Sequence, residues 1–275
     1  MMISVAAEPV FEIWGFSVTN SLVNAWVGLG LFLVVGWLIR RRIALVPKGV
    51  VGFFDWLVEF LLQEVQKVTG DRERARRFFP LCGALFFFIL LSNWLGLFPG
   101  VGSIGFFEMH KGVRELIPLF RPATSDLNFT LAIAALSIIA THIFGILAVG
   151  AASHASKFVN VRGIIRAFRK GPVAVLVAVV EFFVGLIEMS SEAAKTLSLA
   201  LRLFGNVFAG EVLLTVIYSL ASLVVPLPFL FLELLVGVIQ ATVFSMLVLV
   251  FLKSMTESHG ESEEEGHPSP VHASG

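Results

Sequence analysis

The stretch EFFVGLIEMSSEAAKTLSLALRLFGNVFAGE, which runs from Glu181 to Glu211, is for the most part as apolar as a membrane-spanning helix. Its charged residues nevertheless follow a pattern, because four of them are spaced seven positions apart: Glu181, Glu188, Lys195 and Arg202. Seven residues are close to two helical turns, so these side chains would form one slowly drifting line along a helix. An arginine at mid-bilayer costs about 2.5–3.5 kcal/mol on insertion scales. The pattern therefore predicts a polar seam that faces protein or water and has a function.

The surroundings of Arg202 distinguish it from the other charges of the seam. By the same arithmetic, Ser198 and Asn206 fall within roughly 40° of Arg202, whereas Glu211 falls near the opposite face of the helix. Arg202 has no acid three or four residues away, so a local ion pair is not available to it. We therefore expect its counter-charge to come from another element or another chain.

The composition is typical of a multi-span membrane protein. The 275-residue chain is 57% hydrophobic and only 15% charged, and its apolar segments predict an all-α integral membrane fold. A formal net charge of +0 gives no indication of nucleic-acid binding. The one cysteine, Cys82, excludes an internal disulfide and is interpreted as a small buried packing residue. The first residues include acids but no lysine or arginine, so we expect no cleaved signal or transit peptide.

Five apolar segments are long enough to cross a bilayer: 22–39, 79–98, 127–150, 173–225 and 229–252. Segment 50–78 instead repeats polar side chains every three or four positions, which predicts an amphipathic helix at the membrane surface. Together they predict a single membrane domain, 1–252. The acidic tail, 253–275, is expected to be disordered.

The longest segment, 173–225, contains no proline and exceeds the thickness of a membrane. A helix of about 45 residues is roughly 65 Å long, whereas the hydrocarbon core is about 30 Å thick. We expect a strong tilt, because nothing breaks the helix and its seam needs a protein partner along its length. Pro226 and Pro228 would make the turn into the last helix.

Basic residues are unevenly distributed between the two ends of the spans. One side holds Arg40, Arg41 and Arg42, the run DRERARR at 71–77 and five basic residues within 151–171. The loop 99–126 holds only Lys111, Arg114 and Arg121. The positive-inside rule places the more basic side in the cytoplasm, so the N-terminus is expected outside and the C-terminus inside.

The remaining polar residues of the spans have structural interpretations. We expect Asn93 to make an interfacial hydrogen bond, and Asp126, just ahead of Asn128, to cap the next helix. His142 is interpreted as hydrogen-bonded to a neighbouring helix, with a proton relay as the less favoured alternative. The sequence motifs of zinc proteases, Walker loops, nucleophile elbows and CxxC redox sites are absent, so we expect no metal or cofactor.

The segment SLALRLFGNVFAGE, Ser198–Glu211, resembles the most recognisable part of subunit a of bacterial F-type ATP synthases. Further segments resemble that family in the same order: EPVFEIWGFSVTNSL, LLSNWLGLFPG, TSDLNFTLA and FLELLVGVIQATVFSML. The resemblance covers the chain except its acidic tail. It implies one N-terminal span, a surface helix, a two-span hairpin, and two long inclined helices that pack against a rotor ring.

The resemblance also implies the functional residues. Arg202 matches the essential stator arginine of the family. The residues that match positions of one aqueous half-channel are Asn206, Glu211, Glu233 and Gln240. Those that match the other half-channel are Glu188, Lys195 and Ser198. Family members often pair an acid with a histidine where this chain has Glu211 and Glu233. Two close carboxylates would tend to share a proton.

The partners that the resemblance implies are the oligomeric ring of subunit c, the peripheral-stalk subunit b, the rest of the synthase and the lipid bilayer. The chain itself would bind no nucleotide and no nucleic acid. Its location would be the plasma membrane of a bacterium, with the membrane of an energy-transducing organelle as the alternative.

The mechanism can be argued from the chemistry of arginine. Arginine stays protonated at working pH, so Arg202 would be a fixed charge and not a proton carrier. A partner carboxylate would ionise near it and would take up a proton where it faces lipid. Two offset water paths would then couple proton flow to rotation and ATP synthesis.

The orientation assigns the two paths to different acids. Glu211 and Glu233 are assigned to the outer path. The residues assigned to the inner path are Glu188, Glu192 and Lys195. A structural ion pair of Lys195 with Glu188 or Glu192 is an equally open interpretation. The competing functions are a secondary transporter, which usually shows internal repeats that are not visible here, and an intramembrane enzyme.

Overall fold

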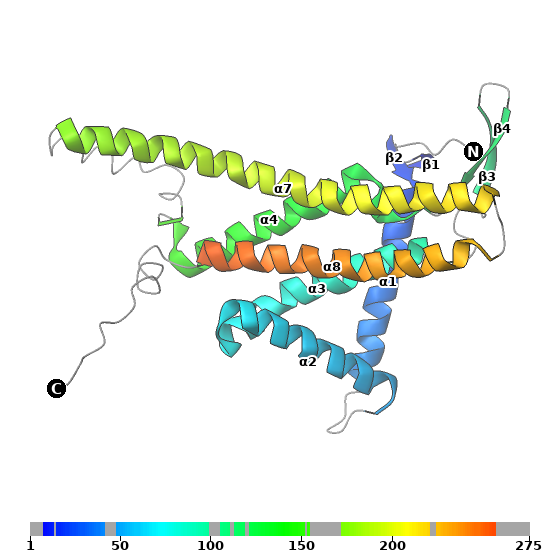
Figure 1. Cartoon of the computed structure of the whole chain (residues 1–275), viewed down its shortest axis with the longest axis horizontal. Helices are drawn as coiled ribbons and strands as arrows, with labels where there is room; N and C mark the ends of the chain where they lie inside the picture. Colours follow the sequence, from blue (N-terminus) through cyan, green and yellow to red (C-terminus); the bar gives the residue numbers. More distant parts are fainter. Residues whose placement is uncertain are drawn as a thin grey trace. The chain divides into compact units, whose positions relative to one another are not determined.

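A computed structural model describes residues 8–13, 15–41, 48–98, 105–110, 113–118, 121–151, 153–154, 172–220 and 224–256 (Figure 1). Its long helices are α1 (Asn20–Arg41), α2 (Val50–Thr69), α3 (Arg72–Gly96), α4 (Leu127–Val149), α7 (Pro172–Leu220) and α8 (Pro226–Thr256). All of them except α2 are long and apolar enough to cross a membrane. The all-α integral membrane fold is therefore confirmed.

Two small antiparallel hairpins accompany the helices, and the sequence did not predict them. Strand β1 (Pro9–Ile13) pairs with β2 (Phe16–Thr19) ahead of α1, and β3 (Gly105–His110) pairs with β4 (Val113–Pro118) between α3 and α4. A 3-10 turn, η1 (Ala123–Ser125), leads into α4. The loop expected at 99–126 thus contains regular structure.

The chain divides into two compact units. Unit 1 comprises Met1–Ala135 and Thr196–Leu249, and unit 2 comprises Leu136–Lys195 and Val250–Gly275. Three helices, α4, α7 and α8, run from one unit into the other. Each unit is described by itself below.

The core of unit 1 is built by helices that approach one another closely. Ala134 of α4, Ala200 of α7 and Ala241 of α8 are fully buried together with Ile89 of α3 and Val248 of α8. Within a bilayer the hydrophobic effect does not drive helices together, so small residues that allow close van der Waals packing take over that role. This packing holds the polar residues of unit 1 in defined positions.

The helix predicted over 50–78 is interrupted at Gly70. Gly70 adopts a left-handed φ of 76°, and its N–H bonds the carbonyl of Gln66, which ends α2 at Thr69. Asp71 then caps α3, because its carboxylate accepts a hydrogen bond of 3.0 Å from the N–H of Arg74. That bond lowers the pKa of Asp71 below its ordinary value. The basic run therefore opens the second span and does not end the surface helix.

The last two helices also differ from their predicted bounds. Helix α7 has 49 residues, about 73 Å at 1.5 Å per residue, contains no proline after its first residue, Pro172, and ends at Leu220. Pro226 and Pro228 lie in the first turn of α8 and not in the preceding turn, because the first N–H groups of a helix need no intrahelical acceptor. Helix α8 continues to Thr256, so 253–256 are helical, and the rest of the predicted tail lies outside the described residues. Cys82 is buried as predicted.

Candidate functional site

Arg202 lies on the exposed face of α7. Leu199, Ala200 and Leu203 of the same helix turn towards the core of unit 1 and are buried. The opposite face is exposed at Ser198, Leu201, Arg202, Gly205, Asn206, Ala209 and Leu213. Because these positions recur every three or four residues, they form one continuous stripe along the helix. The stripe is apolar or weakly polar except for the guanidinium of Arg202.

No hydrogen bond or ion pair connects Arg202 to the residues of unit 1 that the structure describes. The side chains of Ser198, Asn206 and Gln240 likewise make no hydrogen bond to the described residues of unit 1. Asn206 shares the exposed stripe with Arg202, whereas Gln240 of α8 is half-buried. The predicted roles of these residues therefore stay predictions, and the structure adds where each one lies.

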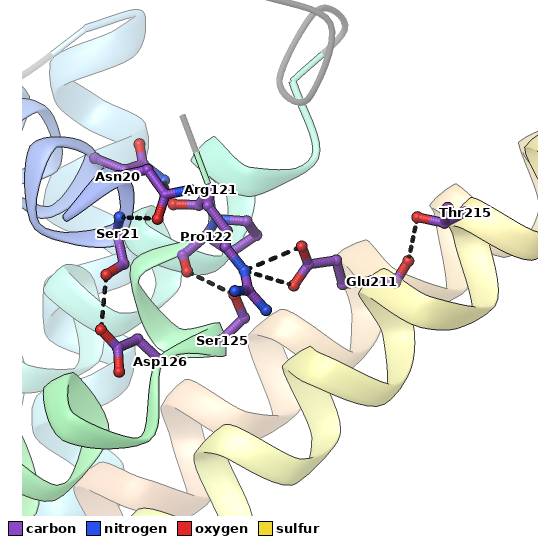
Figure 2. A network of polar contacts seen from close by, with 9 residues as sticks. Asn20, Ser21, Arg121, Pro122, Ser125, Asp126, Glu211 and Thr215 are labelled. Atoms are coloured by element: carbon purple, nitrogen blue, oxygen red, sulfur yellow. Dashed lines mark hydrogen bonds and ion pairs between the residues drawn. The ribbon is translucent and has the colours of Figure 1, made fainter. Parts of the chain in front are cut away.

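Glu211 of α7 forms an ion pair with Arg121, which stands in the segment just ahead of η1. The Nε of Arg121 lies 3.2 Å from Oε1 and 3.3 Å from Oε2 of Glu211. Figure 2 shows the arginine side chain directed at this carboxylate. The side chain of Arg121 is 5% exposed and that of Glu211 is 22% exposed. Arg121, Glu211 and the residues that hydrogen-bond their backbones are called the Arg121 cluster below.

Hydrogen bonds from three elements fix the backbone around this ion pair. Asn24 of α1 donates from Nδ2 to the carbonyl of Arg121 at 2.8 Å, and Ser125 of η1 donates to the carbonyl of Pro122 at 2.9 Å. On α7, the hydroxyl of Thr215 donates to the carbonyl of Glu211 at 2.8 Å (Figure 2). The ion pair is thus attached to a rigid frame and not to a mobile loop.

The start of α4 belongs to the same frame. The carboxylate of Asp126 accepts a hydrogen bond of 2.9 Å from the N–H of Asn128 and one of 2.7 Å from the hydroxyl of Ser21 on α1. The first bond is that of a helix N-cap, so this prediction is confirmed. Asn128 contributes its backbone N–H, and its side chain is exposed.

Glu233 of α8 has different surroundings from Glu211. Its carboxyl group lies against Gly210 of α7, where the Cβ of any other residue would overlap the carboxylate. Glu233 is half-buried, and the described residues of unit 1 offer its carboxylate no hydrogen-bond donor. Among the described residues of unit 1, an arginine thus pairs with Glu211 and none pairs with Glu233.

Asn93 of α3 lies deeper than expected. It is buried, its Oδ1 accepts a hydrogen bond of 2.7 Å from the hydroxyl of Thr124, and its Nδ2 donates to the carbonyl of Gly237 at 3.5 Å. The next residue, Trp94, donates from Nε1 to the carbonyl of Leu234 at 3.2 Å. The predicted hydrogen bond is present, and it joins α3 to η1 and α8.

Unit 2 contains a second polar cluster, His142, His154, Glu192 and Lys195, called the His142 cluster below. Nδ1 of His142 and Nε2 of His154 are 3.1 Å apart, and Nε2 of His142 lies 3.9 Å from a carboxylate oxygen of Glu192. The other oxygen of Glu192 accepts a hydrogen bond of 2.6 Å from Nζ of Lys195. Of the two ion pairs proposed for Lys195, the structure contains the one with Glu192. His142 is hydrogen-bonded as predicted, and its partner is a second histidine.

A glycine turn brings His154 to His142. Gly150 ends α4 with a left-handed φ of 88°, and its carbonyl then accepts the N–H of His154 at 2.9 Å. The imidazole of His154 lies against Gly145, where an added Cβ would come within 2.9 Å of its Cε1 atom. The absence of a side chain at Gly145 therefore makes room for the histidine pair.

Sequence reasoning missed Arg121 and His154 as site residues. Arg121 was counted as a loop charge and His154 received no role, since partners far apart in sequence leave no periodic signal. One signal for Arg121 was available. Glu211 has no basic residue within four positions, and the loop 99–126 holds only three, so the partner of Glu211 had few candidates. Among the described residues, no three or more histidine, cysteine, aspartate or glutamate side chains are grouped to hold a metal ion.

Comparison with known proteins identifies the family. The model of the ATP synthase A chain family matches residues 22–253, nearly the whole of the described chain. The chain belongs to this family. An ATP synthase subunit a from Trichlorobacter lovleyi is 32% identical over 241 residues, 87% of this chain and 89% of that protein. The subunit a from Moorella thermoacetica is 30% identical over 258 residues, 94% of this chain and the full length of the relative.

Membership of the ATP synthase A chain family confirms the predicted function as the ion-translocating stator subunit of the synthase. The chain is a multi-pass membrane protein and a component of the ATP synthase complex. The alternative of a secondary transporter is not supported. A further relative, from Propionigenium modestum, is named ATP synthase subunit a, sodium ion specific, and is 31% identical over 269 residues, 94% of this chain and 80% of that protein.

Proposed function

We propose that Arg202 is the stator charge that exchanges with a carboxylate on a rotating ring of subunit c. The observation that carries this proposal is the position of Arg202. It lies in the middle of the exposed stripe of α7, and no acid of unit 1 among the described residues pairs with it. A guanidinium within an apolar span is costly to leave uncompensated, so its counter-charge comes from outside the chain. The flanking Leu201, Gly205 and Ala209 offer a smooth surface to a passing helix.

The exchange couples ion flow to rotation. Arg202 keeps its charge at all working pH values, so a ring carboxylate beside it stays ionised and releases its proton to a nearby water path. Further along the ring the carboxylate faces lipid and must take up a proton first. Each proton that crosses supplies about 2.3 kcal/mol per 100 mV of membrane potential.

Two groups of polar residues line the two water paths. The outer path uses Asn206, Glu211, Glu233 and Gln240, and the inner path uses Glu188, Glu192, Lys195 and Ser198. Burial of Glu192 and half-burial of Glu211 and Glu233 in apolar helices support this assignment, because buried ionisable residues in spans mark ion pathways. The distribution of basic residues supports an outer N-terminus and a cytoplasmic C-terminus.

The peripheral-stalk subunit b is the second partner of the chain. Helix α2 supplies a surface for lipid or for this partner. Its aromatic side chains Phe53, Trp56 and Phe60 are exposed, with the last two rings stacked at 5.8 Å. Exposed aromatic residues on an amphipathic helix are typical of the membrane interface.

The proposal is tested in inverted membrane vesicles that contain the whole synthase with Arg202→Ala. We expect proton-driven ATP synthesis and ATP-driven proton pumping to fall about 100-fold or more, because the charge that ionises the ring carboxylate is gone. Arg72→Ala is the matched control, since Arg72 is half-exposed and pairs with Glu59 at 3.1 Å on the surface, and surface pairs contribute little. Pumping that survives Arg202→Ala would refute the proposal.

The identity of the ion is tested in the same vesicles. We propose that it is the proton, and pumping should therefore proceed in buffer free of sodium and collapse on addition of a protonophore. A requirement for millimolar sodium would instead place the chain beside its relative from Propionigenium modestum.

A further inference from the structure

The two glutamates of the proposed outer path are not equivalent in their charge surroundings. Glu211 faces the guanidinium of Arg121 at 3.2 and 3.3 Å, in a place where the arginine is almost fully buried. Glu233 faces the backbone of Gly210 and has no hydrogen-bond donor among the described residues of unit 1. This asymmetry suggests different roles for two residues of the same type.

Arg121 is built into the frame of unit 1. Its carbonyl is held by Asn24 of α1, and the following Pro122 restricts the backbone and accepts a hydrogen bond from Ser125. The ring of Phe208 lies 6.0 Å from the guanidinium carbon, on the side of α7. The backbone that carries the guanidinium is therefore fixed beside α7.

The charge of Glu211 is tied to that of Arg121. Arginine does not deprotonate, so a proton on Glu211 would leave a buried guanidinium without its counter-ion. Breaking a buried pair by neutralising one partner is far more costly than removing both. Glu211 is consequently suited to remain an anion while protons pass.

Glu233 is suited to the opposite role. A proton can bind its carboxylate without breaking an ion pair that the structure describes, and the carboxyl group occupies the space that Gly210 leaves open. The described contact of this carboxyl group is with Gly210, and the charged residue next to Gly210 in the sequence is Glu211.

We propose that Arg121 is a positioning residue of the outer path: it holds Glu211 as a fixed ion pair, so that Glu233 is the carboxylate that exchanges protons there. A proton from outside water binds a carboxylate oxygen of Glu233 and then passes to the ring carboxylate, which returns Glu233 to its anion. The inference rests on the proposed function, because it assigns tasks within the path that Arg202 serves.

A double-mutant cycle in the intact synthase tests the pairing. We expect Arg121→Gln to lower ATP-driven proton pumping about 10-fold, because Glu211 is left as an unpaired buried anion. The double variant Arg121→Gln/Glu211→Gln should recover to within about 3-fold of the parent, and Arg121→Lys should retain most of the pumping. Arg114→Gln is the matched control, an arginine of β4 that should leave pumping within about 2-fold.

Glu233 provides the second arm of the experiment. Glu233→Gln should abolish pumping both alone and in the Arg121→Gln/Glu211→Gln background, since no other carboxylate of the path is free to take the proton. The amount of assembled synthase in each membrane, measured by immunoblot, normalises the rates. Additive losses in the double variant, or pumping by Glu233→Gln, would overturn the inference.

The failure of this inference is distinguishable from failure of the proposed function. If Arg202→Ala abolishes pumping but Arg121→Gln and Glu211→Gln act additively, only the division of tasks between the glutamates is wrong. If Arg202→Ala pumps normally, the proposed function fails and the inference falls with it.

Discussion

The Arg121 cluster and the His142 cluster are both polar groups within apolar helices, but they are built from opposite kinds of residue. The Arg121 cluster pairs a carboxylate with arginine, the one cation that does not titrate. The His142 cluster joins two histidines to Glu192 and Lys195, and histidine changes its charge between pH 5 and 8. The comparison teaches that one chain can hold a charge constant at one place and leave it variable at another.

A glycine also makes room for a polar side chain in two places, beside the Arg121 cluster and within the His142 cluster. Gly210 leaves room for the carboxyl group of Glu233, and Gly145 leaves room for the imidazole of His154. Neither glycine has a positive φ, so both are needed for space and not for backbone conformation. Close approach of a polar side chain to a helix backbone is therefore a shared feature of two otherwise different clusters.

Among the variants that test this comparison, the largest effect is expected from filling the space at Gly210. Gly210→Val places branched carbon atoms where the Glu233 carboxyl group lies, so we expect ATP-driven proton pumping to fall about 10-fold or more. Gly36→Val on α1 is the control, since nothing lies within 4 Å of a Cβ at that position. Equal losses in the two variants would show that added bulk in a membrane span is harmful in general, and the specific link to Glu233 would be lost.

A smaller effect is expected from removing the titratable group of the His142 cluster. His142→Gln keeps a hydrogen-bonding side chain but cannot take up and release a proton, so pumping should fall about 3- to 10-fold. The comparison is Arg121→Lys, which should retain most of the pumping. Full pumping in His142→Gln would mean that the cluster is structural, and the contrast between the two clusters would disappear.

Variants of Asn93 test an uncharged buried hydrogen bond, for comparison with the charged contacts of the two clusters. Asn93→Leu leaves the hydroxyl of Thr124 without its acceptor, which should destabilise the subunit by about 1–3 kcal/mol while proton pumping per assembled synthase stays within about 2-fold. Asn93→Leu/Thr124→Val should recover part of that stability, because both partners are then apolar. Thermal aggregation of the detergent-solubilised synthase measures the difference, and a double variant less stable than the single would contradict the account.

The smallest effect concerns a carboxylate outside the membrane spans. The N–H of Arg74 lowers the pKa of Asp71 from its ordinary value near 3.8, so the capping contribution of Asp71 is fully present above that value and is lost as the pH falls through the lower folded pKa. Asp71→Ala should speed amide hydrogen exchange at Arg74 by up to about 10-fold at pH 7. Asp55→Ala, an exposed acid of α2, is the control, and unchanged exchange in Asp71→Ala would exclude the cap.

Much of the fold followed from patterns within single segments. The five spans, the length of α7, which no internal proline interrupts, and the cap at Asp126 depend on local composition, and the structure reproduces them. The boundary between α2 and α3 was wrong, because an amphipathic pattern continued across Gly70 and the glycine was not weighed as a helix end. Pro226 was misplaced for a similar reason, since proline both ends and begins helices.

The sequence by itself determined the membrane class, the number of spans and the isolation of Arg202, because each depends on the hydrophobicity and spacing of residues within about fifty positions of one another. Only the tertiary structure decided which charges meet. Arg121 and Glu211 are 90 positions apart, and no periodicity connects a loop residue to a helix that follows it so much later. Their pairing is a consequence of packing that brings η1, α1 and α7 together, and burial then makes the pairing of opposite charges a physical necessity.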